Sequence, residues 1–230
     1  KENGFFLRQQ NVGKFFVTSG NRIVVELEEG ENSPDFELYL RGTCFGVLLM
    51  QRGMIPIHGS ALAADGKCII ITGKSGAGKS TLAAALNQRG YQFISDDIVA
   101  LNVDGNGDVW VVPGYPQQKL WRDSAEILLG GVKQLKRINA MRDKYYLPVR
   151  RNCNQENVKL AAMLELEPAM VERVGIKELS GMDKLKSIIG NTYRIELIDN
   201  LGIAKAHFSK CAAISKKVSV AQIVRPDNGF

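Results

Sequence analysis

The sequence predicts an α/β domain preceded by a small β-rich module, and three observations support this expectation. A hydrophobic run, Cys68–Thr72, leads into a glycine-rich segment, Gly73–Ser80, and an Ala/Leu-rich segment follows it. Strand, glycine loop and helix in this order are the context of a phosphate-binding loop. The first forty residues instead carry runs that are typical of β-strands. The 230 residues, 45% of them hydrophobic, suffice for one substantial core.

The N-terminal segment contains runs rich in β-branched and aromatic residues, separated by turn-forming residues. Strands are expected at Lys14–Thr18, Arg22–Leu27 and Phe36–Leu40. A helix is expected at Thr43–Arg52, with Thr43 as its N-cap and Gly53 at its end. We therefore expect residues 1–53 to form a β-rich module with a linking helix, and residues 54–230 to form the catalytic domain.

The rest of the chain alternates between strand and helix patterns. Asp65–Gly66 predicts a tight hairpin between two of the strands. Strands are expected at Ile57–Ala64, Lys67–Thr72, Tyr91–Ile94, Ile98–Val103, Val109–Val112, Lys144–Leu147, Lys159–Glu167 and Val218–Val224. Helices are expected at Lys79–Arg89 and Asp123–Leu129, and the pattern from Ile176 to Lys217 is mainly helical.

The segment Gly73–Ser80 (GKSGAGKS), called the glycine loop below, has the composition that phosphate binding requires. Its glycines let the backbone curl so that successive N–H groups point at phosphate oxygens, at the positive end of the following helix. Lys79 can reach the β- and γ-phosphates, and the Ser80 hydroxyl can ligate Mg²⁺. The expected nucleotide-binding residues are Gly73, Lys74, Ser75, Gly76, Ala77, Gly78, Lys79, Ser80 and Thr81. A guanine-specific Asn-Lys-x-Asp motif is absent from the sequence, which favours ATP over GTP.

Two adjacent carboxylates, Asp96 and Asp97, end the hydrophobic run that begins at Phe93. A strand that ends in carboxylates after a glycine loop is typical of a metal-holding element, although a strand-end turn or helix cap gives the same pattern. Adjacent residues of a strand point to opposite faces. One carboxylate is therefore expected at the metal and the other at the acceptor of a phosphoryl group.

Composition narrows the class of protein. The four cysteines lack paired spacing and only two histidines occur, which disfavours a disulfide framework, a zinc site and a His-rich metal site. The sequence contains neither an apolar run long enough to span a membrane nor a secretory signal, so a cytoplasmic protein without a membrane partner is expected. Residues 119–151 carry nine Lys/Arg against three Asp/Glu. That excess indicates either a solvated face or a surface for an anionic partner. Nucleic acid is not expected, because no recognition motif accompanies the charge.

Three motifs resemble the HPr kinase/phosphorylase superfamily: Ile57–Gly59, the glycine loop, and Gly90–Asp97 (GYQFISDD). Further segments resemble compact HPr-kinase-like kinases of lasso peptide biosynthesis clusters, which phosphorylate a precursor-peptide serine: Pro113–Trp121, Lys144–Pro148 and Asn191–Arg194. The resemblance implies a P-loop, PEP-carboxykinase-like mixed sheet with flanking helices and a small N-terminal β module. It also implies an ATP- and Mg²⁺-dependent serine kinase.

Carried onto this chain, the resemblance implies a role for each candidate residue. Asp96 would be the general base, His58 would lie near the γ-phosphate, and Lys79 would hold the phosphates. Ser80 and Asp97 would hold Mg²⁺. Thr81 departs from the family, where Glu usually follows the loop serine.

Several alternatives stay open at this point. The acceptor is expected to be a serine of a peptide or small protein, with HPr as an alternative to a lasso precursor, and a nucleotide switch without transfer as another class. The arginines that could complete the site are Arg122, Arg142, Arg150 and Arg151. Whether the chain forms a homo-oligomer is also left open.

Overall fold

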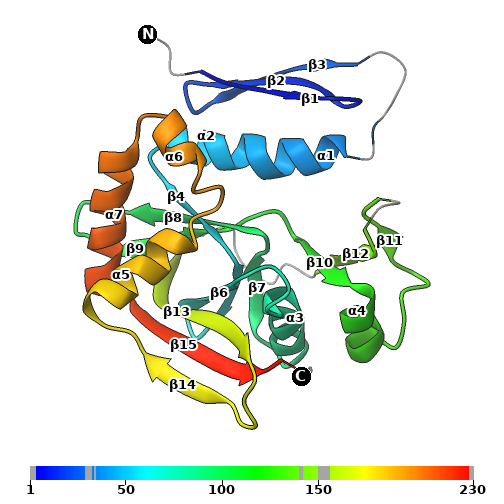
Figure 1. The fold of residues 1–230 in the computed structure, drawn as a ribbon, viewed down its shortest axis with the longest axis vertical. Helices are drawn as coiled ribbons and strands as arrows, with labels where there is room; N and C mark the ends of the chain where they lie inside the picture. The colour runs from blue at the N-terminus through cyan, green and yellow to red at the C-terminus, as the bar shows by residue number, and fades with distance from the viewer. Residues whose placement is uncertain (1–3, 29–32, 34, 140–141, 150–155, 228–230) are drawn as a thin grey trace.

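The computed structural model describes residues 4–28, 33, 35–139, 142–149 and 156–227. An N-terminal sheet lies across a long helix, and the helix lies against a larger sheet that has further helices around it (Figure 1). A third, small sheet stands to one side of the larger one. No helix among the described residues is long and apolar enough to cross a membrane.

The N-terminal sheet consists of three antiparallel strands in the order β1-β2-β3. Their bounds are β1 (Phe5–Gln9), β2 (Gly13–Thr18) and β3 (Arg22–Leu27). The helix beneath runs through α1 (Phe36–Tyr39), a π-helical turn η1 (Leu40–Cys44) and α2 (Phe45–Gln51). Phe15 and Val17 of β2 pack against Val47 of α2 to form the core of this part. The strands expected at Lys14–Thr18 and Arg22–Leu27 are confirmed.

The segment Phe36–Leu40 is helical, so the strand predicted there is wrong. Phe36, Tyr39 and Leu40 lie on one helical face and pack onto the sheet. A five-residue run with this spacing satisfies a helix as well as a strand, and the stacking of Phe36 on Phe15 at 5.8 Å resolves the choice. Thr43 consequently lies inside the helix and is not its N-cap. The helix ends at Gly53 as predicted, with φ of 73°.

The large sheet has nine strands. They are β4 (Ile55–His58), β5 (Ser60–Ala64), β6 (Lys67–Gly73), β7 (Gln92–Ser95), β8 (Ile98–Val103), β9 (Val109–Val112), β13 (Val158–Ala169), β14 (Gly175–Glu178) and β15 (Ser219–Pro226). Seven of them follow the order β4-β8-β9-β13-β6-β5-β7, while β15 pairs with β13 and β14. β13 runs parallel to β6 and β15, and the remaining pairs are antiparallel. This is the mixed sheet that the resemblance implied.

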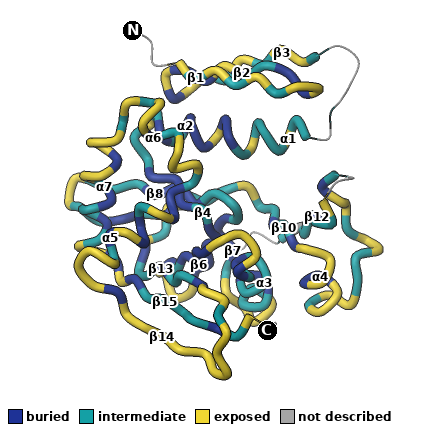
Figure 2. The backbone as a smooth tube through the Cα atoms, in the orientation of Figure 1, coloured by how far each residue is buried: buried dark blue, intermediate teal, exposed yellow. Residues whose placement is uncertain are grey.

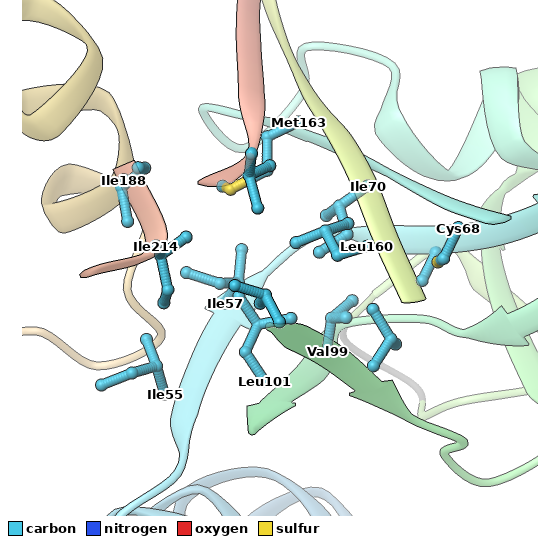
Figure 3. Packing of buried hydrophobic residues seen from close by; sticks show 14 of the residues in the cluster. Ile55, Ile57, Cys68, Ile70, Val99, Leu101, Leu160, Met163, Ile188 and Ile214 are labelled. Carbon is cyan, nitrogen blue, oxygen red and sulfur yellow. The ribbon is translucent and has the colours of Figure 1, made fainter. Parts of the chain in front are cut away.

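Helices cover both faces of this sheet. α3 (Lys79–Gln88) packs on one face, where it meets Ile71. α5 (Gly181–Gly190) and α7 (Ala204–Lys217) pack on the other face, where Ile188 and Ile214 meet Ile70 (Figure 3). Ile70 and Ile71 are neighbours on β6, so their side chains point to opposite faces of the sheet, and each belongs to the hydrophobic core on its own face. The central strands are correspondingly buried, whereas β14 is exposed along its length (Figure 2).

Two details differ from the expected strands and helices. The predicted strand Ile57–Ala64 is two strands, because the chain breaks at Gly59 and β4 pairs with β8 while β5 pairs with β6. A Cβ at Gly59 would lie 2.6 Å from the backbone oxygen of Ile71, so the sheet leaves room only for glycine there. The predicted helical region Ile176–Lys217 begins with the strand β14 and includes the short α6 (Leu197–Asn200).

The third sheet and α4 (Arg122–Leu129) form a lobe beside α3, called the arm below. Its strands pair in the order β10-β12-β11, with β10 (Gln117–Trp121), β11 (Lys136–Arg137) and β12 (Lys144–Pro148). The arm is anchored to α3 through a buried cluster that includes Ala84, Leu120 and Ala125. Sequence reasoning predicted α4 and β12 but not β10, which reaches the candidate site.

Candidate active site

The glycine loop joins the end of β6 to the start of α3, as the sequence predicted. Gly73, Gly76 and Gly78 have φ of 130°, 84° and 94°, values that favour glycine. A Cβ at Gly73 would lie 2.4 Å from the backbone oxygen of Leu166 on the neighbouring strand. The loop therefore curls tightly against the sheet and presents its far side to solvent.

Lys79 folds back over the loop at the first position of α3. Its Nζ donates hydrogen bonds of 2.8 Å to the oxygen of Gly73 and 3.0 Å to the oxygen of Lys74. Burial and the charge of Lys144 lower the pKa of this ammonium. These carbonyls hold the side chain over the loop, where an incoming anion would meet it.

Asp96 faces the start of α3. Its Oδ1 accepts hydrogen bonds from Ser80 Oγ at 3.2 Å and from Ser60 Oγ at 2.6 Å, and its Oδ2 accepts one from the backbone N–H of Lys119 at 3.0 Å. Burial and the neighbouring Asp97 raise the pKa of this carboxyl group. The donors hold it in one orientation beside the Ser80 hydroxyl.

Asp97 points elsewhere because the backbone turns between β7 and β8, with φ of 66° at this residue. Its carboxylate pairs with the ammonium of Lys119. Burial raises the pKa of Asp97, but Lys119 and Lys144 outweigh burial and hold it below its usual value. The structure thus pairs Ser80 with Asp96, in contrast to the expectation that Ser80 and Asp97 share a metal. That expectation came from the family resemblance, and strand alternation does not apply to the pair because both aspartates lie between β7 and β8.

His58 lies at the end of β4, beside the acidic pair. Its Nδ1 is 3.0 Å from the backbone oxygen of Asp97, which can only accept, so Nδ1 carries the proton. Its backbone N–H donates to the oxygen of Asn191 at 2.8 Å. Burial and the charge of Lys79 lower the pKa of His58, so the imidazole is neutral near pH 7.

Lys79, Asp97 and His58 line a cavity of about 270 Å³ between the glycine loop, the arm and α1, whereas Asp96, predicted as the general base, is not among its lining residues. The predicted residues that line it are His58, Ser75, Gly76, Gly78, Lys79, Ser80, Thr81 and Asp97. Gly73, Lys74 and Ala77 belong to the loop but do not line the cavity, and Thr81 also exchanges a hydrogen bond of 2.8 Å with Ser124.

Several lining residues were missed by sequence reasoning as parts of the site. They are Leu38, Tyr39, Thr43, Lys119, Leu120, Trp121, Ile138, Lys144, Tyr193 and Arg194. The segments Pro113–Trp121, Lys144–Pro148 and Asn191–Arg194, which carry part of the family resemblance, contain six of them. The family resemblance of these segments could have indicated that they belong to the site, but it did not indicate which of their side chains face the glycine loop.

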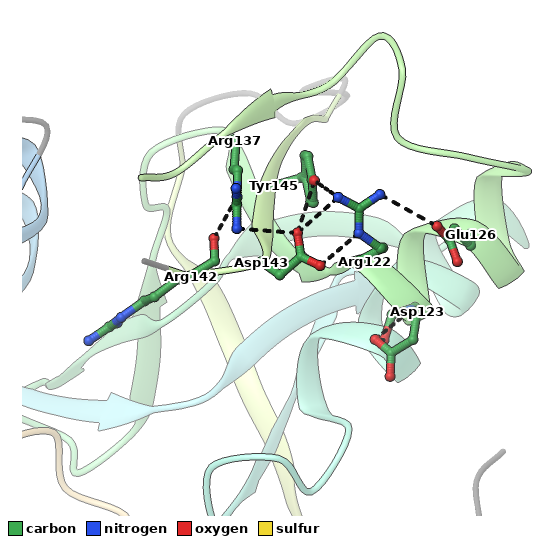
Figure 4. Close-up of polar contacts among 8 residues, drawn as sticks. Arg122, Asp123, Glu126, Arg137, Arg142, Asp143 and Tyr145 are labelled. Atoms are coloured by element: carbon green, nitrogen blue, oxygen red, sulfur yellow. Dashed lines mark hydrogen bonds and ion pairs between the residues drawn. The ribbon is translucent and has the colours of Figure 1, made fainter. Parts of the chain in front are cut away.

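The four candidate arginines separate into different locations. Arg142 lines the cavity. Arg122 instead pairs with Asp143 at 2.7 Å, in an exposed cluster on the arm (Figure 4). Arg150 and Arg151 lie outside the described residues.

A mixed α/β sheet with a glycine loop between strand and helix, and an acidic pair at the end of a nearby strand, is typical of proteins with phosphate-binding loops. Comparison with known proteins shows which proteins with a phosphate-binding loop this chain resembles. A family model described as HPr Serine kinase C-terminal domain matches residues 52–119, which include His58, the glycine loop and both aspartates. The resemblance predicted from the sequence is confirmed for this segment.

Individual relatives cover only part of the chain. An HPr kinase/phosphorylase of Mycoplasmopsis pulmonis is 39% identical over 66 residues, which are 28% of this chain and 21% of the relative. One of Pelodictyon phaeoclathratiforme is 28% identical over 102 residues, which are 40% of this chain and 31% of the relative. The Hpr(Ser) kinase/phosphatase structure from Coxiella burnetii has 15% identity and a TM-score of 0.37, with 74% of this chain and 85% of that chain covered.

Proposed function

We propose that this chain is a Mg·ATP-dependent kinase that transfers the γ-phosphoryl group to a serine hydroxyl of a peptide. The observation that carries the proposal is that two adjacent carboxylates have different neighbours in and beside the cavity. Asp96 contacts Ser80 at 3.2 Å at the foot of the glycine loop, whereas Asp97 lines the cavity next to it. A protein that only binds nucleotide needs one carboxylate near the metal, and a second one that faces an acceptor favours transfer.

The end of the cavity at the glycine loop fits a nucleoside triphosphate with Mg²⁺. The hydroxyl of Ser80 and Oδ1 of Asp96 are hard oxygen donors, which Mg²⁺ prefers, and they lie close enough to share one ion or its water. The bound ion would neutralise charge on the β- and γ-phosphoryl oxygens. Lys79 would exchange the carbonyls of Gly73 and Lys74 for phosphate oxygens, and the loop amides would bind the remaining ones.

The other end of the cavity fits the acceptor. Serine Oγ attacks the γ-phosphorus while the bond from that phosphorus to the β–γ bridging oxygen breaks, and ADP leaves. The serine proton passes to Asp97, which the acceptor reaches when the ion pair with Lys119 opens. Lys119 is then free to neutralise the transferred group. His58 Nε2, with the proton on Nδ1, presents a lone pair near this centre. The roles of the two aspartates are thus the reverse of those expected from the sequence.

The proposal also concerns the identity of the peptide or protein that carries the acceptor serine. The match of residues 52–119 to an HPr serine kinase domain supports a serine as the acceptor group. A lasso peptide precursor is the first acceptor to test, because Lys144–Pro148 and Asn191–Arg194, which lie outside residues 52–119, resemble segments of the kinases of those clusters. HPr is the alternative, and the relatives named HPr kinase/phosphorylase favour its inclusion.

The test is incubation with Mg·ATP and serine peptides, including lasso-type precursors and HPr, read by intact mass. One added phosphate on a precursor peptide supports the proposal, and phosphate on HPr alone favours the alternative. The Lys79→Ala variant should be folded and inactive, and unchanged turnover in it would contradict the assignment of the glycine loop. Nucleotide binding without any modified acceptor would indicate a switch or a small-molecule kinase.

A further inference from the structure

The two faces of strand β12 carry different kinds of cationic sites. On its outer face, Tyr145 forms a closed cluster with Arg122, Arg137 and Asp143, the residue before the strand (Figure 4). Each guanidinium there has a carboxylate within 4.0 Å. The side chain of Arg142 extends away from this cluster (Figure 4). Charge on the outer face is thus largely compensated within the arm.

The inner side of the arm lines the cavity with Arg142 and, on β12, Lys144. No carboxylate of a described residue lies within 4.0 Å of either cationic group. The Nζ of Lys144 instead lies 5.4 Å from the centre of the Trp121 ring, and Arg142 is exposed at the cavity mouth. These two positive charges face the cavity without an ion-pair partner among the described residues.

Two of the other cations that line the cavity, Lys119 and Arg194, have a carboxylate partner, and Lys79 is held by neutral carbonyl oxygens. Lys79 donates to the loop carbonyls, Lys119 pairs with Asp97, and Arg194 lies 3.5 Å from Glu196. In the proposed function, Lys79, the loop amides and a metal ion would bind the nucleotide phosphates at their end of the cavity. Arg142 and Lys144 belong to the arm, as does Lys119, the partner of the carboxylate proposed to receive the acceptor proton. Apart from Lys79, the lining cations that have no carboxylate of a described residue within 4.0 Å are therefore both on the arm, which also carries Lys119.

We propose that Arg142 and Lys144 form an anion subsite for an acidic side chain that lies close to the acceptor serine in the substrate peptide. The inference rests on the proposed function and names the substrate class: serines with an acidic neighbour. Cations bind carboxylates through charge-assisted hydrogen bonds, and a substrate that lacks the carboxylate loses that part of the transition-state stabilisation.

The surroundings of the subsite fit a short extended peptide. Asn139 of the arm donates a hydrogen bond of 2.6 Å to Asp35, next to α1, so the arm and this helix are joined beside the cavity. Between them the lining is apolar or aromatic, with Leu38, Tyr39 and Ile138. A peptide that enters here would meet the two cations on one side and apolar contacts on the other.

The test uses peptides with a single serine and one Asp moved through the flanking positions, each matched by an Asn peptide. Phosphorylation is measured for the wild-type protein and for Arg142→Gln, Lys144→Gln and Lys133→Gln. Lys133 is an exposed lysine of the arm outside the cavity, so its variant removes the same charge without touching the subsite. Affinity for the same peptides with Mg²⁺ and a non-hydrolysable ATP analogue is measured in parallel.

Wild-type protein and Lys133→Gln are expected to favour the best Asp peptide over its Asn match by about tenfold in kcat/KM, equivalent to about 1.4 kcal/mol. Arg142→Gln and Lys144→Gln should lose most of that preference while their KM for ATP changes little. A raised KM for ATP with the peptide preference intact would overturn the inference and assign the cations to the nucleotide. Equal handling of Asp and Asn peptides by the wild type in both assays would also overturn it. Preferential binding of Asp peptides without phosphorylation would support the subsite and refute the kinase proposal.

Discussion

The side-chain oxygen of Asn191 accepts a hydrogen bond of 3.1 Å from the backbone N–H of Gly73, the first residue of the glycine loop. The backbone oxygen of the same asparagine accepts the N–H of His58 at 2.8 Å. One residue, far from both in the sequence, therefore fixes the distance between the loop and the histidine. Asn191 is 8% exposed, so water cannot readily replace these bonds.

Replacement of Asn191 by Ala is predicted to weaken both stability and nucleotide binding. The Gly73 N–H would be left buried without a partner, which costs about 1–3 kcal/mol. Urea denaturation should show that loss, and the affinity for Mg·ATP should fall because the loop is held less firmly. The control is Asn87→Ala on α3, which removes a solvent-exposed hydrogen bond from the Asn87 side chain to the backbone oxygen of Tyr91. A similar small effect in both variants would contradict the bracing role of Asn191.

The two aspartates are predicted to separate binding from chemistry. Asp96→Asn should weaken Mg·ATP binding, because Asp96 lies beside Ser80 at the metal end of the cavity. Asp97→Asn should leave Mg·ATP affinity near the wild-type value and lower kcat by about 10²–10⁴-fold, as expected for loss of a general base. Calorimetry of Mg·ATP binding and single-turnover phosphorylation measure the two effects. The opposite pattern would restore the assignment made from the sequence.

Protonation of His207 is predicted to destabilise the protein in mild acid. His207 is buried, its Nε2 lies 3.0 Å from Thr192 Oγ1, and burial lowers its pKa. The unfolded chain, where the pKa is about 6.5, then binds more protons than the folded one. Stability is therefore full above that pH and is lost as pH falls toward the lowered pKa of the folded state.

The measurement is the free energy of unfolding between about pH 5 and 7.5, below and above the ordinary histidine pKa. His207→Gln can still reach Thr192 but does not titrate, so its stability should depend less on pH than that of the wild type. His58, whose pKa is also lowered, is present in both proteins and cancels in the comparison. Identical slopes for the two proteins would show that His207 is not responsible.

The glycine loop, α3 and the flanking strands β6 and β7 could be predicted because their signals are local. A glycine pattern, an Ala/Leu-rich helix and short hydrophobic runs need no tertiary information. The strand β10 could not be predicted, since Gln117–Trp121 lacks alternation and becomes a strand by pairing with β12. Its Lys119 binds Asp96 through the backbone and Asp97 through the side chain, contacts that sequence reasoning could not reveal.

The directions in which the side chains of Asp96 and Asp97 point could not be predicted from the periodicity of the sequence. Both aspartates were identified from the sequence, strand alternation predicted that they point apart, and the family resemblance implied the role of each. Both lie between the end of β7 at Ser95 and the start of β8 at Ile98, where the left-handed conformation of Asp97 turns the chain, so strand alternation does not apply to the pair. Nothing in the dipeptide indicates which residue adopts the left-handed conformation, because Asp is tolerated in that region at either position.

Gly46 of α2 is predicted to be required by the ring of Tyr193. A Cβ at this position would lie 2.9 Å from Cδ1 and 3.0 Å from Cε1 of that ring. The Tyr193 ring lies 6.0 Å from the His58 ring, so Gly46 is connected to His58 through one intervening side chain. Gly46→Ala would gain about 1 kcal/mol of helix propensity but cost about 1–3 kcal/mol through overpacking.

The expected result for Gly46→Ala is a net loss of stability and a lower kcat, because a displaced Tyr193 ring leaves His58 less well positioned. The matched control is Gly190→Ala at the end of α5, where an added Cβ meets nothing within 4 Å and stability should not fall. In a Tyr193→Ala background the clash is gone, so adding Gly46→Ala should become stabilising. A destabilisation of the same size in both backgrounds would show that the glycine serves the helix itself and not the contact with Tyr193.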